Sequence, residues 1–326
     1  MKFPVQGPWL RWGKRLLTLF FLILLAVLLY MLLRNQDWGE VRQALTAYSG
    51  QTLLVGVLLA AASYLLFACY DLLARRYSRH RLPTQQVLGV AMVCYAFNLN
   101  FTTWIGGMAM RYRLYMRLGL SASTVTRILS LGLLTNWIGY MALAGSLFAL
   151  RLVQLPESWA LGMSGLQLLG FAMLVLVSAY IGICAFAHQR VWHFGERSIT
   201  LPSAGMALLQ LCLGAANWSL MAALIHWLLP EGATYASVLG VLLISCMAAV
   251  VAHIPAGLGV LEAVFLALLQ HQYSHASLIA ALLVYRVLYY LLPLALASIS
   301  YLVLEKRART LRQQGQQSGA REGLPG

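Results

Sequence analysis

The chain has 326 residues, of which 61% are hydrophobic and only 10% are charged. Soluble proteins carry roughly 25% charged residues, so this composition excludes a soluble enzyme or binding module and indicates an integral membrane protein. The formal net charge of +14 does not indicate a nucleic-acid partner, because the basic residues lie in short loops beside apolar runs, where they mark membrane topology.

Apolar runs of a length suited to crossing a bilayer recur along the whole chain. A transmembrane helix needs roughly 20 predominantly apolar residues. We therefore predict an all-α integral membrane protein and no soluble domain. The runs lie at 16–33, 52–70, 87–105, 124–150, 165–187, 205–229, 236–252 and 277–304.

The first apolar run follows a basic stretch, residues 1–15, and could pass for a signal peptide. No small-residue cleavage site follows it, so we interpret it as a retained membrane anchor. We expect residues 1–326 to form a single polytopic membrane domain. Within it, 1–15 should be cytoplasmic, 16–304 should form the membrane bundle, and 305–326 should be a cytoplasmic polar tail without fixed structure.

Two basic clusters decide the predicted topology. "RRYSRHR" (75–81) and "RYRLYMR" (111–117) flank the third apolar run, so a simple crossing would place one cluster outside the cell. The positive-inside rule argues against that arrangement. If 87–110 instead form a re-entrant hairpin, both clusters stay in the cytoplasm. A second hairpin at 237–270 would then enter from the opposite face.

This arrangement predicts about six full transmembrane helices plus two oppositely oriented re-entrant hairpins, with both termini in the cytoplasm. It leaves Arg286 within the membrane. The alternative, eight plain crossings, stays open, but it must place Arg111, Arg113 and Arg117 outside.

The turns of the two predicted hairpins resemble one another. Gly106 precedes Arg111 by five residues, and Gly257 precedes Glu262 by five. Two such turns entering from opposite faces are typical of an inverted repeat with a binding site near the bilayer midplane, and broken helices imply a polar interior. Close helix packing is the alternative role of these glycines. The residues that we expect to form the turns are Gly106, Gly107, Pro255, Gly257 and Gly259.

Ionisable residues within the apolar runs suggest a site. Insertion of a charge at the bilayer centre costs about 2.5 to 3.5 kcal/mol, so such residues usually mark a path or a ligand. Arg286 could bind a headgroup phosphate, and Glu262 an ammonium group or a transported proton. Alternatively, the two form a structural ion pair. His253, beside the second turn, could titrate near neutral pH or simply pack.

Polar residues also surround the first predicted turn. Arg111 and Arg113 alternate with tyrosines, which suits phosphate recognition, although topology marking explains them equally well. Asn98 and Asn100 could line a polar path. The candidate substrate-binding residues are therefore Arg111, Arg113, Glu262, Arg286, His253, Asn98 and Asn100.

Other polar residues in the apolar runs suggest structural roles. We expect Asn136 and Asn217 to form hydrogen bonds between helices. Asp71 should pair with Arg75 at the membrane interface.

Catalytic and metal-binding motifs are missing from the sequence. It contains no nucleophile elbow, P-loop, HExxH motif or usefully spaced pair of carboxylates. "HQRVWHF" (188–194) has two histidines without an evident third ligand, and the five cysteines show no CxxC spacing. We therefore expect no metal, no cofactor, no disulfide and no enzymatic activity.

Three stretches resemble the YbhN-type family of inner-membrane proteins: "YAFNLNFTTWIGGMAMRYRLYMRLGL" (95–120), "HIPAGLGVLEAVF" (253–265) and "YRVLYYLLPL" (285–294). This family is similar in turn to the transmembrane flippase region of bacterial lysylphosphatidylglycerol synthases, the multiple peptide resistance factors. The resemblance implies a bacterial helical bundle with re-entrant elements that moves or binds phospholipid-like substrates. The synthases continue into a cytoplasmic aminoacyl-transfer domain that this sequence lacks, so we do not expect lipid aminoacylation.

These observations lead to one main hypothesis, an inner-membrane lipid transporter with a polar midplane cavity for a phospholipid or polyprenyl-phosphate headgroup. A scaffold that presents lipid to a separate lipid-synthesis enzyme, without transport, is the alternative. An intramembrane enzyme would need a nucleophile and base pair that the sequence does not display. The sequence leaves a homo-oligomer open.

Overall fold

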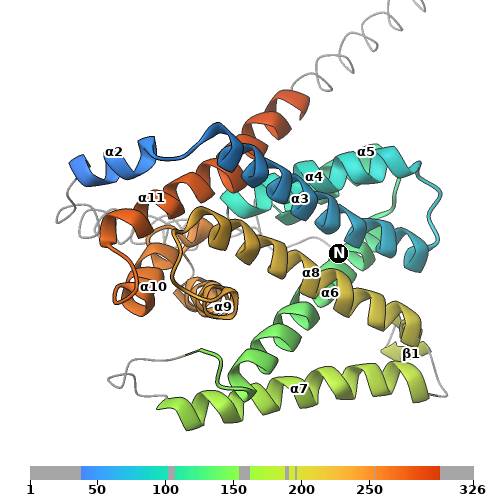
Figure 1. The fold of residues 1–326 in the computed structure, drawn as a ribbon. Helices are drawn as coiled ribbons and strands as arrows, with labels where there is room; N and C mark the ends of the chain where they lie inside the picture. The colour runs from blue at the N-terminus through green and yellow to red at the C-terminus, as the bar shows by residue number, and fades with distance from the viewer. Residues whose placement is uncertain are drawn as a thin grey trace, which may run out of the picture. The chain divides into compact units, whose positions relative to one another are not determined.

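The computed structural model describes residues 38–101, 107–153, 162–187, 191–194, 197–252 and 254–301. These residues are helical except for short connections and one two-stranded ribbon, so the predicted helical class is confirmed (Figure 1). The elements are α2 (Trp38–Thr46), α3 (Gly50–Ser78), α4 (Thr84–Asn100), α5 (Met110–Arg117), α6 (Ala122–Ala149), α7 (Gly162–Phe186), β1 (Val191–Phe194), β2 (Arg197–Thr200), α8 (Ala204–Leu228), α9 (Tyr235–Ala252), the 3₁₀ turn η2 (Pro255–Gly257), α10 (Val260–Leu269), α11 (His275–Arg286) and the π-helical segment η3 (Val287–Leu291).

Five of the predicted full spans are present as long apolar helices. They are α3, α6, α7, α8 and the continuous helix His275–Tyr301, with lengths of 25 to 29 residues. The first predicted span, 16–33, lies outside the described residues. Helix α9 is also long and apolar enough to cross a membrane, although its sequence is the first arm of the second predicted hairpin. Re-entry of this segment therefore stays a prediction.

The chain divides into two compact units, each assembled from separate stretches of sequence. Among the described residues, the first unit takes those from Trp38 to Ser63 and those within Leu133–Tyr285, and the second takes those within Tyr64–Gly132 and from Arg286 to Tyr301. The pair α9 and α10 belongs to the first unit, and the pair α4 and α5 to the second. The expected single membrane domain therefore stays a prediction.

Close helix contacts and buried hydrogen bonds organise the first unit. Helix α8 packs against α7 and α9. It also approaches α6 so closely that a Cβ atom on Gly139 would overlap the backbone of Gly214. The hydroxyl of Ser63 donates to Oδ1 of Asn217 at 2.8 Å, which confirms that this amide joins two helices. Small residues and single polar contacts of this kind are how helices associate in a bilayer, where apolar surface gives no preference for protein over lipid.

Asn136 takes part in a hydrogen bond between helices through its backbone. Its carbonyl accepts from Nε1 of Trp218 at 3.3 Å, which joins α6 to α8. The predicted contact between helices is therefore present at this position, but the group that makes it is the main-chain oxygen.

The strands β1 and β2 form an antiparallel ribbon between α7 and α8, with Val191 opposite Thr200 and Phe194 opposite Arg197. The sequence analysis did not anticipate this ribbon. Valine, tryptophan, phenylalanine and isoleucine in this stretch favour strands, but a ribbon so short gives little periodic signal.

Candidate functional site

A buried ion pair joins α3 to α5 in the second unit. Arg111 donates from Nε and Nη2 to the two carboxylate oxygens of Asp71, at 3.2 and 2.8 Å, and the hydroxyl of Tyr115 donates to Oδ2 at 2.7 Å. Asp71 is fully buried and Arg111 is only 7% exposed. A buried charge is tolerated when it is both paired and hydrogen-bonded, and this carboxylate meets both conditions.

This ion pair corrects the predicted partner of Asp71. The expected partner, Arg75, instead donates from Nη1 to Oγ1 of Thr84 at 2.7 Å, at the start of α4. Arg75 lies one turn nearer the end of α3, from where it reaches Thr84, while the carboxylate faces α5. A phosphate at Arg111 would have to compete with Asp71, so phosphate binding by Arg111 stays a prediction.

The first predicted break lies between α4 and α5. Helix α4 ends at Asn100, and a π-helical turn at 107–109 leads into α5, which packs back against α4. A Cβ atom on Gly107 would overlap the side-chain oxygen of Asn98, so a larger residue here would require the Asn98 side chain to move. The structure thus brings together two residues of the predicted site, whereas Gly106 lies outside the described residues.

A proline in the last helix explains a second group of polar contacts. Pro293 has no N–H, so the carbonyl of Tyr289, four residues earlier, lacks its usual helical donor. The helix adopts the π-helical segment η3 at this point, and the hydroxyl of Tyr64 donates to that carbonyl at 3.1 Å. Asn100 donates from Nδ2 to the neighbouring carbonyl of Tyr290, also at 3.1 Å. The end of α4 is therefore tied to the irregular part of the last helix.

Buried tyrosines surround this irregular segment. The hydroxyls of Tyr95 and Tyr289 lie 2.8 Å apart and share a hydrogen bond. The ring of Tyr95 stacks on Phe67, with ring centroids 3.6 Å apart, and Tyr64 lies against it at 4.8 Å. π-helical segments occur frequently at functional sites, which makes this tyrosine cluster a candidate lining for a binding site.

The two other predicted arginines of this unit contact aromatic rings. Arg286, 9% exposed, lies with its guanidinium carbon 5.4 Å from the centroid of the Tyr290 ring. The exposed Arg113 lies 5.5 Å from the ring of Tyr301. Such cation–π contacts help to orient a guanidinium group.

The second predicted break lies between α9 and α10 in the first unit. Ala256, Gly257 and Gly259 all have positive φ angles, of 56°, 56° and 77°. Glycine adopts such angles freely, whereas a left-handed alanine costs roughly 1 kcal/mol or more. The chain between the two helices therefore has a sharply irregular backbone, at a place where an uninterrupted helix would satisfy its own hydrogen bonds.

Glu262 caps the helix that follows this break. It is the third residue of α10, is 7% exposed, and accepts a hydrogen bond at Oε2 from the N–H of Gly259 at 2.9 Å. A carboxylate at this position satisfies a free N–H and interacts favourably with the helix dipole. The buried charge thus has a local structural role, whatever ligand it also meets.

The predicted site residues are distributed over the two units. The second unit contains Asn98, Asn100, Gly107, Arg111, Arg113 and Arg286. The first unit contains Pro255, Gly257, Gly259 and Glu262. His253, like Gly106, lies outside the described residues. The suggested pair of Glu262 with Arg286 joins residues of different units and stays a prediction. Within the described ranges, no three histidine, cysteine, aspartate or glutamate side chains gather into a metal-binding group.

Several residues of the second unit were missed by the sequence analysis. Tyr115 is one of the tyrosines noted beside Arg111 and Arg113, without a role of its own, and Tyr64 and Tyr95 were not considered. Pro293 was the one sequence signal for the contacts of Tyr64, because a proline within an apolar run frees a carbonyl that some other donor must satisfy.

The comparison with known proteins identifies the family. A sequence model of the lysylphosphatidylglycerol synthase transmembrane region matches residues 16–297. The chain belongs to this family. The inner membrane protein YbhN of Escherichia coli (strain K12) is 47% identical over 310 residues, which cover 95% of this chain and 98% of that protein. An uncharacterized protein of Synechocystis sp. is 29% identical over 295 residues, 88% of this chain and 90% of its own.

The predicted family resemblance is therefore confirmed. Together with the long apolar helices, it identifies a multi-pass inner-membrane protein. The matching part of the synthase family is its transmembrane region.

Proposed function

We propose that this protein is a lipid transporter of the flippase type, which binds the headgroup of a phospholipid or a polyprenyl phosphate in a polar cavity near the midplane. One observation carries the proposal: in each of two helix pairs, the chain is interrupted beside a buried charge, at Arg111 and at Glu262. Irregular backbone at membrane depth requires protein or water around it, and buried charges in spans usually mark a path.

In the proposed topology, α4 with α5 and α9 with α10 are re-entrant hairpins that enter from opposite faces, and both termini are cytoplasmic. Single cysteines test this arrangement. Met116, which is 51% exposed, and the exposed Gln272 are suitable positions, whereas Tyr115 is buried against Asp71. In a cysteine-free background, Met116→Cys should react with an impermeant maleimide from the cytoplasm and Gln272→Cys from the periplasm. Labelling of Met116→Cys from the periplasm would overturn the first hairpin.

In the proposed mechanism, Arg286 holds the phosphate and Glu262 binds an amine or a proton. The acyl chains stay in the bilayer while the headgroup crosses. The sequence carries no nucleotide-binding motif, so a gradient or downhill lipid flow would drive the movement. The synthase family suggests phosphatidylglycerol and its lysyl ester as the first substrates to try.

The direct test is movement of labelled lipid in proteoliposomes. Fluorescent phosphatidylglycerol, phosphatidylethanolamine and a polyprenyl phosphate would be quenched from outside after reconstitution. Glu262→Gln keeps an acceptor for the Gly259 N–H, so it removes the charge while retaining the cap. A charge-assisted contact contributes about 1.5 to 3 kcal/mol, so Glu262→Gln and Arg286→Gln should each slow movement roughly tenfold or more.

Matched controls are available in exposed residues of the same types. Glu231→Gln and Arg127→Gln remove an exposed carboxylate and an exposed guanidinium, and both should leave the rate unchanged. Protein that binds lipid but moves none would favour the scaffold that presents lipid to a synthesis enzyme. Equal rates for the site variants and the controls would refute the proposed site.

A further inference from the structure

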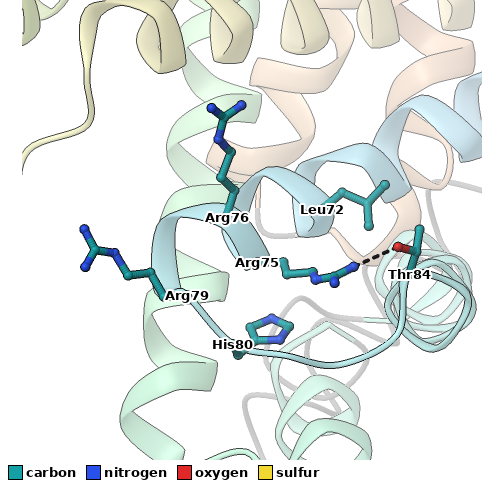
Figure 2. A pocket seen from close by; sticks show the side chains of 6 residues that line it. All are labelled: Leu72, Arg75, Arg76, Arg79, His80 and Thr84. Atoms are coloured by element: carbon teal, nitrogen blue, oxygen red, sulfur yellow. Dashed lines mark hydrogen bonds between the residues drawn. The ribbon is translucent and has the colours of Figure 1, made fainter.

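A basic pocket lies where α3 ends and α4 begins, within the second unit. Its volume is about 480 Å³. We call it the arginine pocket, and its lining residues are Leu72, Arg75, Arg76, Arg79, His80 and Thr84. Figure 2 shows Arg75 directed at Thr84 with the His80 ring beside it, while Arg76 and Arg79 extend outward from the helix end.

The position of the pocket along α3 places it near the lipid headgroups. Helix α3 has 29 residues. At 1.5 Å per residue it is about 44 Å long, whereas the hydrocarbon core is roughly 30 Å thick. The helix is therefore longer than the apolar layer, and its arginine-bearing last turn is the part suited to lie beyond that layer. Arg79, with a φ of 55°, ends the helix and turns the chain back toward α4.

The charge of the arginine pocket is not balanced by its own lining. Three of the described lining residues are arginines and none is acidic. The carboxylate nearest in sequence, Asp71, has both oxygens engaged by Arg111, and Tyr115 adds a third hydrogen bond. An anion from outside the chain is the natural complement for such a group of guanidinium side chains.

The pocket also contains polar groups that are oriented for hydrogen bonding to a ligand. Arg75 is oriented by its 2.7 Å hydrogen bond from Nη1 to Thr84, a contact that does not use Nε or Nη2. The two ring nitrogens of His80 are shielded from solvent and have no hydrogen-bond partner among the described residues. Buried polar atoms are almost always hydrogen-bonded in proteins, so the His80 ring is suited to donate to an acceptor that binds in the basic pocket beside it. The amino-terminal end of α4, which begins at Thr84, adds its positive dipole end.

We propose that the arginine pocket binds a phosphate group, carried either by an anionic lipid headgroup at the membrane surface or by a free phosphate ion. A guanidinium matches two phosphate oxygens with two parallel N–H donors, and Arg75 is held in position to do so. This site is distinct from the proposed midplane cavity, because it lies at the end of α3 and the start of α4 and uses none of the residues assigned to that cavity. It would hold or select anionic lipid at the surface, independently of translocation.

Binding to the purified full-length protein in neutral detergent tests the proposal. The first probe is inorganic phosphate, and the second is dihexanoyl phosphatidylglycerol, both titrated against sodium chloride of equal ionic strength. Microscale thermophoresis reports affinity and thermal unfolding reports folding. Arg75→Gln should weaken binding at least about tenfold, because a hydrogen bond between charged groups is worth more than one neutral contact.

A control and a second variant keep the test decisive. Arg127→Gln removes an exposed arginine on α6 of the same unit and should leave the affinity unchanged. If Arg75→Gln fails to fold, the double variant Arg76→Gln with Arg79→Gln, which changes exposed side chains alone, should still weaken binding about threefold or more.

The outcomes separate the ligand sources. Saturable binding of phosphatidylglycerol alone assigns the pocket to a lipid headgroup, and binding of inorganic phosphate as well assigns it to phosphate in general. Absence of saturable binding to either probe would overturn the proposal. An equal loss of affinity in Arg127→Gln and in the pocket variants would also overturn the proposal, since that result would show diffuse attraction to a basic surface. No lipid movement is measured, so a failure here is independent of the transport assay.

Discussion

Arg111 and Asp71 lie 40 residues apart in the sequence and form a bidentate, buried ion pair in the structure. Removal of one partner from such a pair strands the other charge in an apolar environment, which costs about 3 to 5 kcal/mol. We therefore expect Arg111→Met and Asp71→Asn each to lower the thermal unfolding temperature strongly in detergent.

The double variant Asp71→Leu with Arg111→Met distinguishes the pair from two independent packing residues. Because an apolar replacement of both partners leaves no stranded charge, its stability should recover to within roughly 2 kcal/mol of the wild type. Additive losses in the double variant would show that the two side chains are not coupled. Lipid transport by this double variant also tests whether Arg111 contacts substrate, since the fold would be retained without the guanidinium.

The hydrogen bond from Tyr64 to the Tyr289 carbonyl should depend on Pro293. In the wild type, Tyr64→Phe removes one hydrogen bond to that carbonyl, at a cost of about 0.5 to 1.5 kcal/mol. Pro293→Ala supplies the missing N–H and permits a regular helix. The loss of folding stability caused by Tyr64→Phe should then be smaller in the Pro293→Ala background, as measured by a double-mutant cycle of thermal unfolding.

An equal loss in both backgrounds would contradict this explanation of the π-helical segment. Tyr140→Phe is a suitable control, because its hydroxyl donates to the Leu243 carbonyl in the other unit. Its effect should be the same with and without Pro293.

The sequence was informative wherever the signal is local. Long apolar runs predicted α3, α6, α7 and α8 because a transmembrane helix satisfies its hydrogen bonds within one segment. Glycine and proline predicted an irregular backbone between α9 and α10, and the positive φ angles at Gly257 and Gly259 lie there. These residues act on their immediate neighbours, so a single sequence carries the information.

Partner choice was not predictable, because it depends on which helix faces which. Asp71 and Arg75 are one turn apart and make a reasonable pair on an isolated helix. In the folded chain Asp71 instead meets Arg111 of α5, and no pattern in one sequence specifies that contact. The contacts of Asn100 with the Tyr290 carbonyl depend in the same way on the packing of α4 against the last helix.

In the turn before α10, we expect glycine at position 256 to stabilise the folded protein and alanine at position 257 to destabilise it. Ala256 has a left-handed backbone with a φ of 56°, which costs an L-residue roughly 1 to 2 kcal/mol, so Ala256→Gly should raise the thermal unfolding temperature. Gly257→Ala should lower it, since Gly257 shares that conformation and an added Cβ would lie 3.2 Å from the side chain of Ala249. Opposite signs for the two variants are the expected result, and a loss in both would contradict the left-handed conformation at Ala256.

His80 should make the protein less stable in mild acid. Burial of its ring, followed by the nearby Arg75, lowers the pKa of His80 below the usual 6.5, while Asp71 acts weakly in the opposite direction. Tyr115, with its ring centroid 6.4 Å away on α5, and Thr84 on α4 are neutral neighbours. The folded protein therefore favours the neutral imidazole.

The unfolded chain protonates His80 more readily than the folded protein does. The contribution of His80 to folding stability is therefore fully present above pH 6.5 and is lost as the pH falls through the lowered pKa of the folded state. A His80→Gln variant lacks this titration. Between pH 7.5 and about pH 5, the unfolding temperature of the wild type should consequently fall further than that of His80→Gln. Both are measured in a buffer free of phosphate. A bound phosphate would attract the protonated ring, so saturating phosphatidylglycerol should reduce this shift if it occupies the arginine pocket. A pH profile identical in the two proteins would show that the ring titrates as it does in the unfolded chain.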